Sequence, residues 1–238
     1  MSALSSAIVV AVFSGLILTP RVLAQGTAEA KSSPPPAAAV QGPAVASPAT
    51  DAAPSPEQVQ RAEKIAATLG LTDPDQTIRV RDLIARQYAD LSVIHAARDA
   101  ALKSAKEAGG ESATQAARDN AASRQADLHY AFLARLAAEL SPAQIDQVKD
   151  GLTYGVLPNT FKVYQEMLPQ LTPEQKRQIF TWLTEAREHA LDAGSSNDKH
   201  AWFGKYKGRI NNYLSKAGID MKQAEHEMFA RKKESATK

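Results

Sequence analysis

The sequence contains no cysteine among its 238 residues. This absence excludes disulfide bonds, thiolate nucleophiles and metal sites with cysteine ligands. Small secreted proteins often depend on disulfides because their hydrophobic cores are small. A chain without disulfides needs a larger core, and residues 57–238 are long enough to form one domain with such a core.

The common catalytic motifs are absent as well. The sequence has no Gly-x-Ser-x-Gly nucleophile motif, no phosphate-binding P-loop, no dinucleotide-binding glycine motif and no His-Glu-x-x-His zinc motif. No two carboxylates stand out as a glycosidase pair, although such pairs assemble in space and not in sequence. We therefore expect a protein that is not an enzyme and that uses no cofactor.

The N-terminus has the pattern of a signal peptide over residues 1–24. Residues 7–18 form an apolar run, shorter than the roughly 20 residues that span a bilayer. Thr19-Pro20 ends this run, and Val-Leu-Ala at residues 22–24 is typical of a signal-peptidase site. We predict cleavage after Ala24, a periplasmic or secreted protein, and only transient membrane contact through the signal peptide. An uncleaved anchor is the alternative, because no Lys or Arg precedes the apolar run.

Residues 25–55 are rich in proline and alanine and contain almost no large apolar side chain. Such a segment cannot bury enough apolar surface to offset the entropy lost on ordering. We predict a disordered linker over residues 25–55, followed by a single helical domain over residues 56–238.

Charge is distributed unevenly within the predicted domain. Residues 199–233 hold nine Lys/Arg against three Asp/Glu, whereas residues 57–198 hold sixteen against twenty. The C-terminal part is therefore the expected face for an anionic or acidic ligand.

Three segments share one pattern that is typical of helix starts. Ser or Thr is followed directly by Pro, and Gln stands three positions after the hydroxyl residue. The hydroxyl accepts a hydrogen bond from the backbone N–H of that third residue, and Pro has the backbone angle of the first helical position. These starts are at Ser55, Ser141 and Thr172.

Apolar spacing and glycine stops predict helices over residues 56–69, 74–108, 112–140, 142–150, 160–168, 173–193, 197–217 and 221–233. Residues 151–159 look irregular because they contain Gly155 and Pro158. The two longest helices should pair across Gly109-Gly110. Because no segment alternates like a strand, we predict an all-α protein: a helical bundle with a long antiparallel helical hairpin and a C-terminal helical subregion.

The most informative segment is residues 192–214. On a helix that begins near Asn197, one stripe is apolar and should face the core, and it consists of Phe203, Tyr206, Ile210, Tyr213 and Leu214. A neighbouring stripe combines an aromatic ring with cations and an amide, and it consists of Trp202, Lys205, Arg209 and Asn212.

Two glycines inside this helix, Gly204 and Gly208, suggest that something approaches its backbone closely, since each costs about 1 kcal/mol relative to alanine. One interpretation is packing against another helix, with Trp202 half buried. The other is a ligand groove, in which an aromatic ring packs on a sugar or a base and the polar groups donate hydrogen bonds. The predicted ligand-binding residues of this groove are Trp202, Lys205, Arg209 and Asn212 along one wall, with His200, Ser195 and Ser196 near its mouth.

Glu185, His189 and Asp192 share one helix face and are the metal-ligand candidates. A solvated charged face is the favoured interpretation, so we expect no metal site. His95 and His129 lie on long amphipathic helices and are predicted to be packing or surface residues.

The segment also resembles a known family, the bacterial secreted domain of unknown function 3826. The residues that carry the resemblance are 192–196, Asp-Ala-Gly-Ser-Ser, and 199–214, Lys-His-Ala-Trp-Phe-Gly-Lys-Tyr-Lys-Gly-Arg-Ile-Asn-Asn-Tyr-Leu. The resemblance covers most of residues 57–235 and implies a sugar-binding protein. It implies no catalytic residues.

A looser resemblance connects residues 140–144, Leu-Ser-Pro-Ala-Gln, and 171–175, Leu-Thr-Pro-Glu-Gln, to the Leu-Thr-x-x-Gln motif of periplasmic chaperones of the Spy and CpxP type. We expect an exported, non-enzymatic protein that binds a carbohydrate or a small anionic ligand. The alternative is a Spy/CpxP-like chaperone or envelope-stress adaptor. Nucleic acid is not expected as a partner because the net charge is only +2 and the protein is exported, and no particular protein partner is indicated.

Overall fold

The computed structural model describes residues 52–236. The predicted signal peptide, the cleavage site after Ala24 and most of the predicted linker lie outside the described residues. All described residues belong to one unit of the chain by their contacts.

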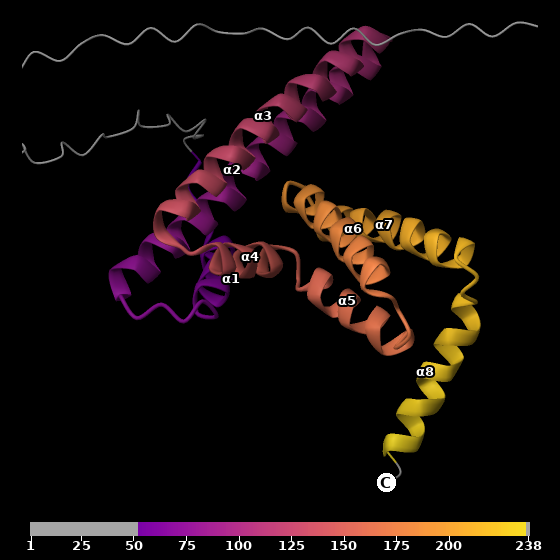
Figure 1. Ribbon diagram of the computed structural model, residues 1–238. Coiled ribbons are helices and arrows are strands. Elements are labelled where there is room, and N and C mark those ends of the chain that lie inside the picture. Colours follow the sequence, from indigo (N-terminus) through magenta and orange to yellow (C-terminus); the bar gives the residue numbers. More distant parts are fainter. Residues whose placement is uncertain (1–51, 237–238) are drawn as a thin grey trace, which may run out of the picture. The chain divides into compact units, whose positions relative to one another are not determined.

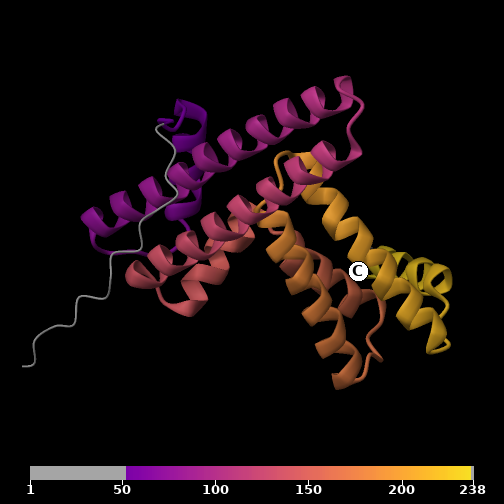
Figure 2. The ribbon, with the colours of Figure 1, turned by 90° about the horizontal axis from the view of Figure 1, so that it is seen from above.

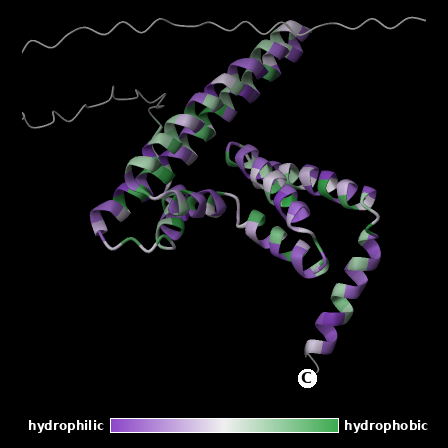
Figure 3. Ribbon diagram, viewed as in Figure 1, coloured by the Kyte–Doolittle hydropathy of each residue, from purple (hydrophilic) through white to green (hydrophobic). Residues whose placement is uncertain are grey.

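Helices dominate the described residues, which contain no strand (Figure 1). This confirms the predicted all-α class. The helices are α1 (Pro56–Ala66), α2 (Pro74–Glu107), α3 (Glu111–Glu139), α4 (Pro142–Leu152), α5 (Val156–Met167), α6 (Pro173–Leu191), α7 (Ser196–Lys216) and α8 (Met221–Ala236). Polar and apolar residues are mixed along each of them, as expected for amphipathic helices (Figure 3).

The three predicted helix starts are confirmed in atomic detail. Ser55, Ser141 and Thr172 each accept a hydrogen bond from the backbone N–H of the glutamine three residues later, and that glutamine accepts one from the capping residue's N–H. Each pair therefore satisfies two donors that have no partner within the helix. These short sequence patterns determine where α1, α4 and α6 begin.

The long helices α2 and α3 form the predicted antiparallel hairpin (Figures 1 and 2). The turn between them uses Gly109 with a φ of 70°, a left-handed conformation that glycine adopts without strain. Helices α1 and α4 pack near the open end of the hairpin around buried Val80, Ile84 and Leu136. This packing forms the first core of the protein.

The predicted irregular segment 151–159 is wrong at both ends, because α4 continues to Leu152 and α5 already begins at Val156. Gly155 precedes the helix with a φ of 64°, and Pro158 occupies the third helical position. The first four N–H groups of a helix have no acceptor within it, so proline there loses no hydrogen bond. The other helix ends differ from the predicted ones by at most three residues.

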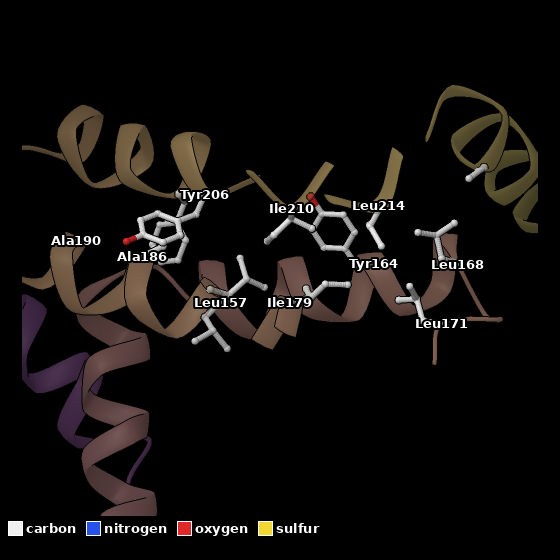
Figure 4. Close-up of a cluster of buried hydrophobic side chains, with 13 residues drawn as sticks. Leu157, Tyr164, Leu168, Leu171, Ile179, Ala186, Ala190, Tyr206, Ile210 and Leu214 are labelled. Carbon is white, nitrogen blue, oxygen red and sulfur yellow. The ribbon is translucent and has the colours of Figure 1, made fainter. Parts of the chain in front are cut away.

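A second core joins α5, α6, α7 and part of α8 (Figure 4). Phe203, Ile210 and Leu214 of α7 are almost fully buried in it, together with Ile179 and Leu183 of α6. The predicted apolar stripe of α7 is therefore its core face, with Tyr213 only partly buried. This packing determines which side of α7 remains available to solvent.

Candidate functional site

A cavity of about 670 Å³ lies where the α2–α3 hairpin meets α6 and α7. Its wall combines aromatic, basic, acidic, amide and small apolar side chains. The lining residues that matter most for its chemistry are His95, Arg98, Gln125, Asp192, Trp202 and Lys205.

Trp202 forms the aromatic part of this wall. Its ring stacks on that of His189, with the ring centroids 4.3 Å apart and the planes 15° apart. The Nζ atom of Lys205 lies 5.0 Å from the centroid of the Trp202 ring, a cation–π distance. The tryptophan is only half buried, so its side chain contributes both to packing and to the cavity surface.

The four residues that were predicted to line one wall of a groove border two separate concavities in the structure. Trp202 and Lys205 line the cavity, whereas Arg209 and Asn212 line a second concavity together with Trp182. There the guanidinium of Arg209 lies 4.5 Å from the centroid of the Trp182 ring and 3.4 Å from Glu185. Lys205 borders both concavities. Sequence spacing alone did not separate these two neighbourhoods.

The residues predicted near the mouth have local roles in α7. Ser195 is its N-cap and accepts a hydrogen bond from the backbone N–H of Asp198. His200 Nδ1 lies 2.7 Å from the carbonyl oxygen of Ser196, and its ring stacks on Tyr154. Within the described part of the chain, these three residues do not line the cavity.

The glycines of α7 do not support close packing by another helix. A Cβ atom placed on Gly204 or Gly208 would meet no atom within 4 Å among the described residues. In the segment that leads into α7, Gly194 has a close neighbour, because a Cβ there would lie 2.9 Å from Cγ of His95. The packing interpretation therefore applies at Gly194 and not inside α7.

The three metal-ligand candidates have separate partners. Glu185 pairs with Arg209, His189 stacks on Trp202, and Asp192 contacts the ring of His129. Among the described residues, no group of three or more His, Asp or Glu side chains could hold a metal ion.

Sequence reasoning missed the contribution of the hairpin to the site. His95 Nε2 lies 2.8 Å from the carbonyl oxygen of Asp192, and Gln125 Nε2 donates to the same oxygen at 2.9 Å. These contacts join α2 and α3 to the end of α6, across 97 and 67 residues of sequence. Because no local pattern links residues so far apart, no signal in the sequence could have found them.

A charged network lies directly behind the cavity. It connects α3, α4 and α6 through His129, Asp146, Lys149, Asp150, Arg187, Glu188 and Asp192. Lys149 donates to Glu188, and Arg187 donates to both Asp146 and Asp150. The network ties the hairpin side of the protein to the helix that carries Asp192.

His129 is a member of this network and not simply a packing or surface residue. Its Nδ1 lies 3.0 Å from Asp192 Oδ2 and its Nε2 lies 3.7 Å from Glu188. The hydrogen bond to Asp192 raises the pKa of His129 above its usual value, and nearby Glu188 adds to this effect. Protonated His129 therefore stabilises the folded state.

We expect this stabilisation to disappear at alkaline pH. Because the pKa of His129 is higher in the folded state than in the unfolded state, its protonation adds to the free energy of unfolding. This contribution is complete below the unfolded pKa of about 6.5 and is lost as the pH rises through the folded pKa. Urea unfolding of the wild type and of His129→Gln should show the largest difference in free energy of unfolding near about pH 6 and a smaller one near about pH 9. His226→Gln removes an exposed histidine from α8 and serves as the control. A difference that does not change with pH would contradict the role of His129.

A buried lysine secures the end of α6 beside the cavity. Lys199 Nζ donates to the carbonyl oxygens of Ala190 and Leu191 at 3.1 and 3.2 Å. These oxygens belong to the last turn of α6, whose carbonyls lack the usual helical donor four residues later. Burial lowers the pKa of Lys199 to about 8. Lys199 thus positions the segment that contains Asp192 and Gly194.

A family model described as a protein of unknown function (DUF3826) matches residues 56–234. No curated protein matches the chain. None of the described helices is both long enough and apolar enough to cross a membrane.

Proposed function

Because the chain belongs to the DUF3826 family, whose description names no function, we propose a function from the site itself: the protein binds a small carbohydrate in the cavity between the hairpin and α6–α7. The observation that carries this proposal is the composition of the wall around Trp202. An aromatic ring, cations, carboxylates and an amide surround one volume of about 670 Å³. Sites for small molecules typically occupy about 300–1,000 Å³.

The lining suits a ligand that has both polar and apolar faces. Trp202 can pack on the C–H face of a sugar ring, while Gln125, Arg98 and Asp198 offer donors and acceptors for hydroxyl groups. Lys205 is exposed, and in the proposed complex its ammonium leaves the ring face and donates to the ligand instead. No residue of the wall has the arrangement of a catalytic nucleophile and base, and we propose binding without catalysis.

The exposed apolar residues support ligand binding over chaperoning. A chaperone of the Spy or CpxP type would need a broad apolar surface for unfolded clients. The large exposed apolar side chains of the described residues are instead spread over five helices and the turn between α4 and α5, at Ile78, Tyr130, Tyr154, Val163, Phe180 and Phe229. The cavity is the more specific feature, so ligand binding is our first proposal and chaperone activity is the second.

We expect Trp202→Ala to lower glycan affinity by at least about tenfold, which corresponds to about 1.4 kcal/mol. The chain has two tryptophans, so Trp182→Phe leaves Trp202 as the only tryptophan reporter of binding. A glycan array on protein recovered from the periplasm would identify the sugar, and fluorescence titration of Trp182→Phe would measure its affinity. Isothermal titration calorimetry would compare the wild type with Trp202→Ala, which lacks the reporter ring. The intact mass of the same preparation tests our further proposal of export with cleavage after Ala24, which a chain that begins at Met1 would contradict.

Trp182→Phe also serves as the matched control, because it changes the other tryptophan and keeps an aromatic ring against Tyr213. It should retain binding. Equal affinities for the wild type and Trp202→Ala, or the absence of any glycan ligand, would refute the proposed function. Circular dichroism of each variant separates a loss of binding from a loss of folding.

A further inference from the structure

The proposed function makes no use of the second concavity, which has a volume of about 600 Å³. Its lining combines the basic residues Lys205, Arg209 and Lys216 with the rings of Trp182 and Tyr213. One amide and one glycine complete the lining, and no lining residue is acidic. The concavity is therefore a positively charged surface with aromatic rings beside the charges.

The positive charge follows the solvent side of α7. From Lys199 to Lys216 this helix contains five Lys/Arg and no Asp/Glu. Lys205, Arg209 and Lys216 stand at positions i, i+4 and i+11, so they share one stripe of the helix. All three are exposed, and neither lysine of the stripe forms an ion pair among the described residues. This stripe is part of the C-terminal basic excess that the sequence predicts to face an anionic ligand.

Arg209 is the cation of the stripe with the best-defined position. Its guanidinium carbon lies over the Trp182 ring, 4.5 Å from the ring centroid, so its N–H donors remain available at the edge of the guanidinium plane. One of these donors reaches Glu185 at 3.4 Å, with the two side chains 55% and 45% exposed. Because solvent screens so exposed an ion pair, an anionic ligand can join or replace Glu185 at this edge.

The helix backbone is open to a ligand beside Arg209. Gly208 lines the concavity and is exposed. A Cβ atom placed there would meet no atom within 4 Å among the described residues, so no other side chain fills the space above the helix. This openness gives the costly glycine inside α7 a reason that helix packing does not supply.

The second concavity adjoins the cavity, because Lys205 lines both. Each of them holds one of the two tryptophans with a cation over its ring. Lys205 lies over Trp202 and Arg209 lies over Trp182. The two cations are one helical turn apart, about 6 Å along α7. The surface therefore repeats one pair of chemical groups over the distance of neighbouring units in a short chain of sugars.

We infer that the second concavity binds the anionic group of an acidic sugar unit, a carboxylate or a sulfate, while a neighbouring unit of the same oligosaccharide occupies the cavity beside Trp202. This inference rests on the proposed carbohydrate function and narrows the ligand to an acidic oligosaccharide. Two oxygens of a carboxylate or a sulfate match the planar fork of Arg209. Lys205 and Lys216 add positive charge around that group.

Two matched pairs of oligosaccharides test the requirement for a negative charge. Trigalacturonic acid is compared with its methyl ester, and a sulfated κ-carrageenan tetrasaccharide with its desulfated form. The first pair tests a carboxylate and the second a sulfate. We expect the acidic member of at least one pair to bind the wild type about tenfold or more tightly in isothermal titration calorimetry. This preference should shrink as salt is added, because salt screens exposed charges.

Arg209→Gln tests the position of the acidic group. It should weaken binding of the preferred acidic oligosaccharide by about tenfold, and Arg209→Lys should have an intermediate effect because it keeps the charge without the fork. Lys207→Gln is the matched control. It removes one positive charge from the same helix, but Lys207 lines a different concavity beside α5 and α8, so affinity should change by less than about twofold. Circular dichroism checks that each variant is folded.

The outcomes separate this inference from the proposed function. If a glycan binds in a manner that depends on Trp202, but the acidic and uncharged members of both pairs bind equally, the cavity function stands and the inference is overturned. Equal losses for Arg209→Gln and Lys207→Gln would also overturn it, because attraction to net charge alone would explain the binding. An acidic oligosaccharide whose affinity depends on Arg209 but not on Trp202 would support the anionic site and refute the function proposed for the cavity. If neither these probes nor any array glycan binds, both proposals are overturned together.

Discussion

Phe203→Ala is expected to lower the free energy of unfolding by about 3–5 kcal/mol, the range for removing a buried phenylalanine side chain. Phe203 is 1% exposed and lies in the core shared by α5, α6 and α7. Deleting its ring removes apolar burial and leaves a cavity that close-packed neighbours cannot fill completely. Urea unfolding followed by circular dichroism at the helix band would measure the change.

The adjacent residue provides the informative comparison. Trp202→Ala should cost less stability than Phe203→Ala, although tryptophan is the larger residue, because Trp202 already exposes part of its ring to the cavity. If the two variants lose equal stability, then Trp202 is a core residue and any loss of glycan binding would reflect unfolding. The pair therefore tests whether the site residue and the core residue have separate roles.

Arg187→Ala is expected to cost about 2–4 kcal/mol, close to the range for removing one partner of a buried ion pair. The side chain of Arg187 is 7% exposed, and its guanidinium lies 2.6 Å from Asp146 and 2.9 Å from Asp150. Without it, these two carboxylates and Glu188 repel one another. The partial exposure of the carboxylates moderates the loss, because solvent screens part of the repulsion.

Two further variants show whether the cost depends on burial and on geometry. Arg61→Ala breaks an exposed pair with Glu57 in α1 and should cost only about 0.5 kcal/mol. Arg187→Lys keeps the positive charge but loses the planar fork that contacts two carboxylates, so its cost should be intermediate. Equal losses for Arg187→Ala and Arg61→Ala in thermal or urea unfolding would show that the network behind the cavity contributes little.

The helical elements could be predicted because their signals are local. Ser141 and Gln144 are three residues apart, and the hydrogen bonds that start α4 form between those residues and no others. Leu214, Ile210 and Phe203 recur at helical spacing, so the core face of α7 was also predicted. The prediction was wrong at the start of α5, where Gly155 and Pro158 look like helix breakers but occupy positions that a helix start tolerates.

The candidate site could be predicted only on the side that α7 supplies. Helical spacing placed Trp202 and Lys205 close together, and both line the cavity. The same spacing grouped Arg209 with them, yet this residue turns to Trp182 and Glu185 on the neighbouring helix. The direction of a long side chain depends on what lies beside the helix, and the spacing within one helix does not contain that information.

By itself, the sequence determined the helical class, most helix boundaries, the hairpin and the core face of α7, since each depends on hydrogen bonds or periodicity within a few residues. Only the tertiary structure decided which residues complete the cavity. His95 and Gln125 reach the end of α6 because the hairpin packs there, and packing between distant segments results from the summed burial of many side chains. It also decided that another side chain approaches closely at Gly194 and not at Gly204 or Gly208, because close approach is a property of two surfaces and not of one helix.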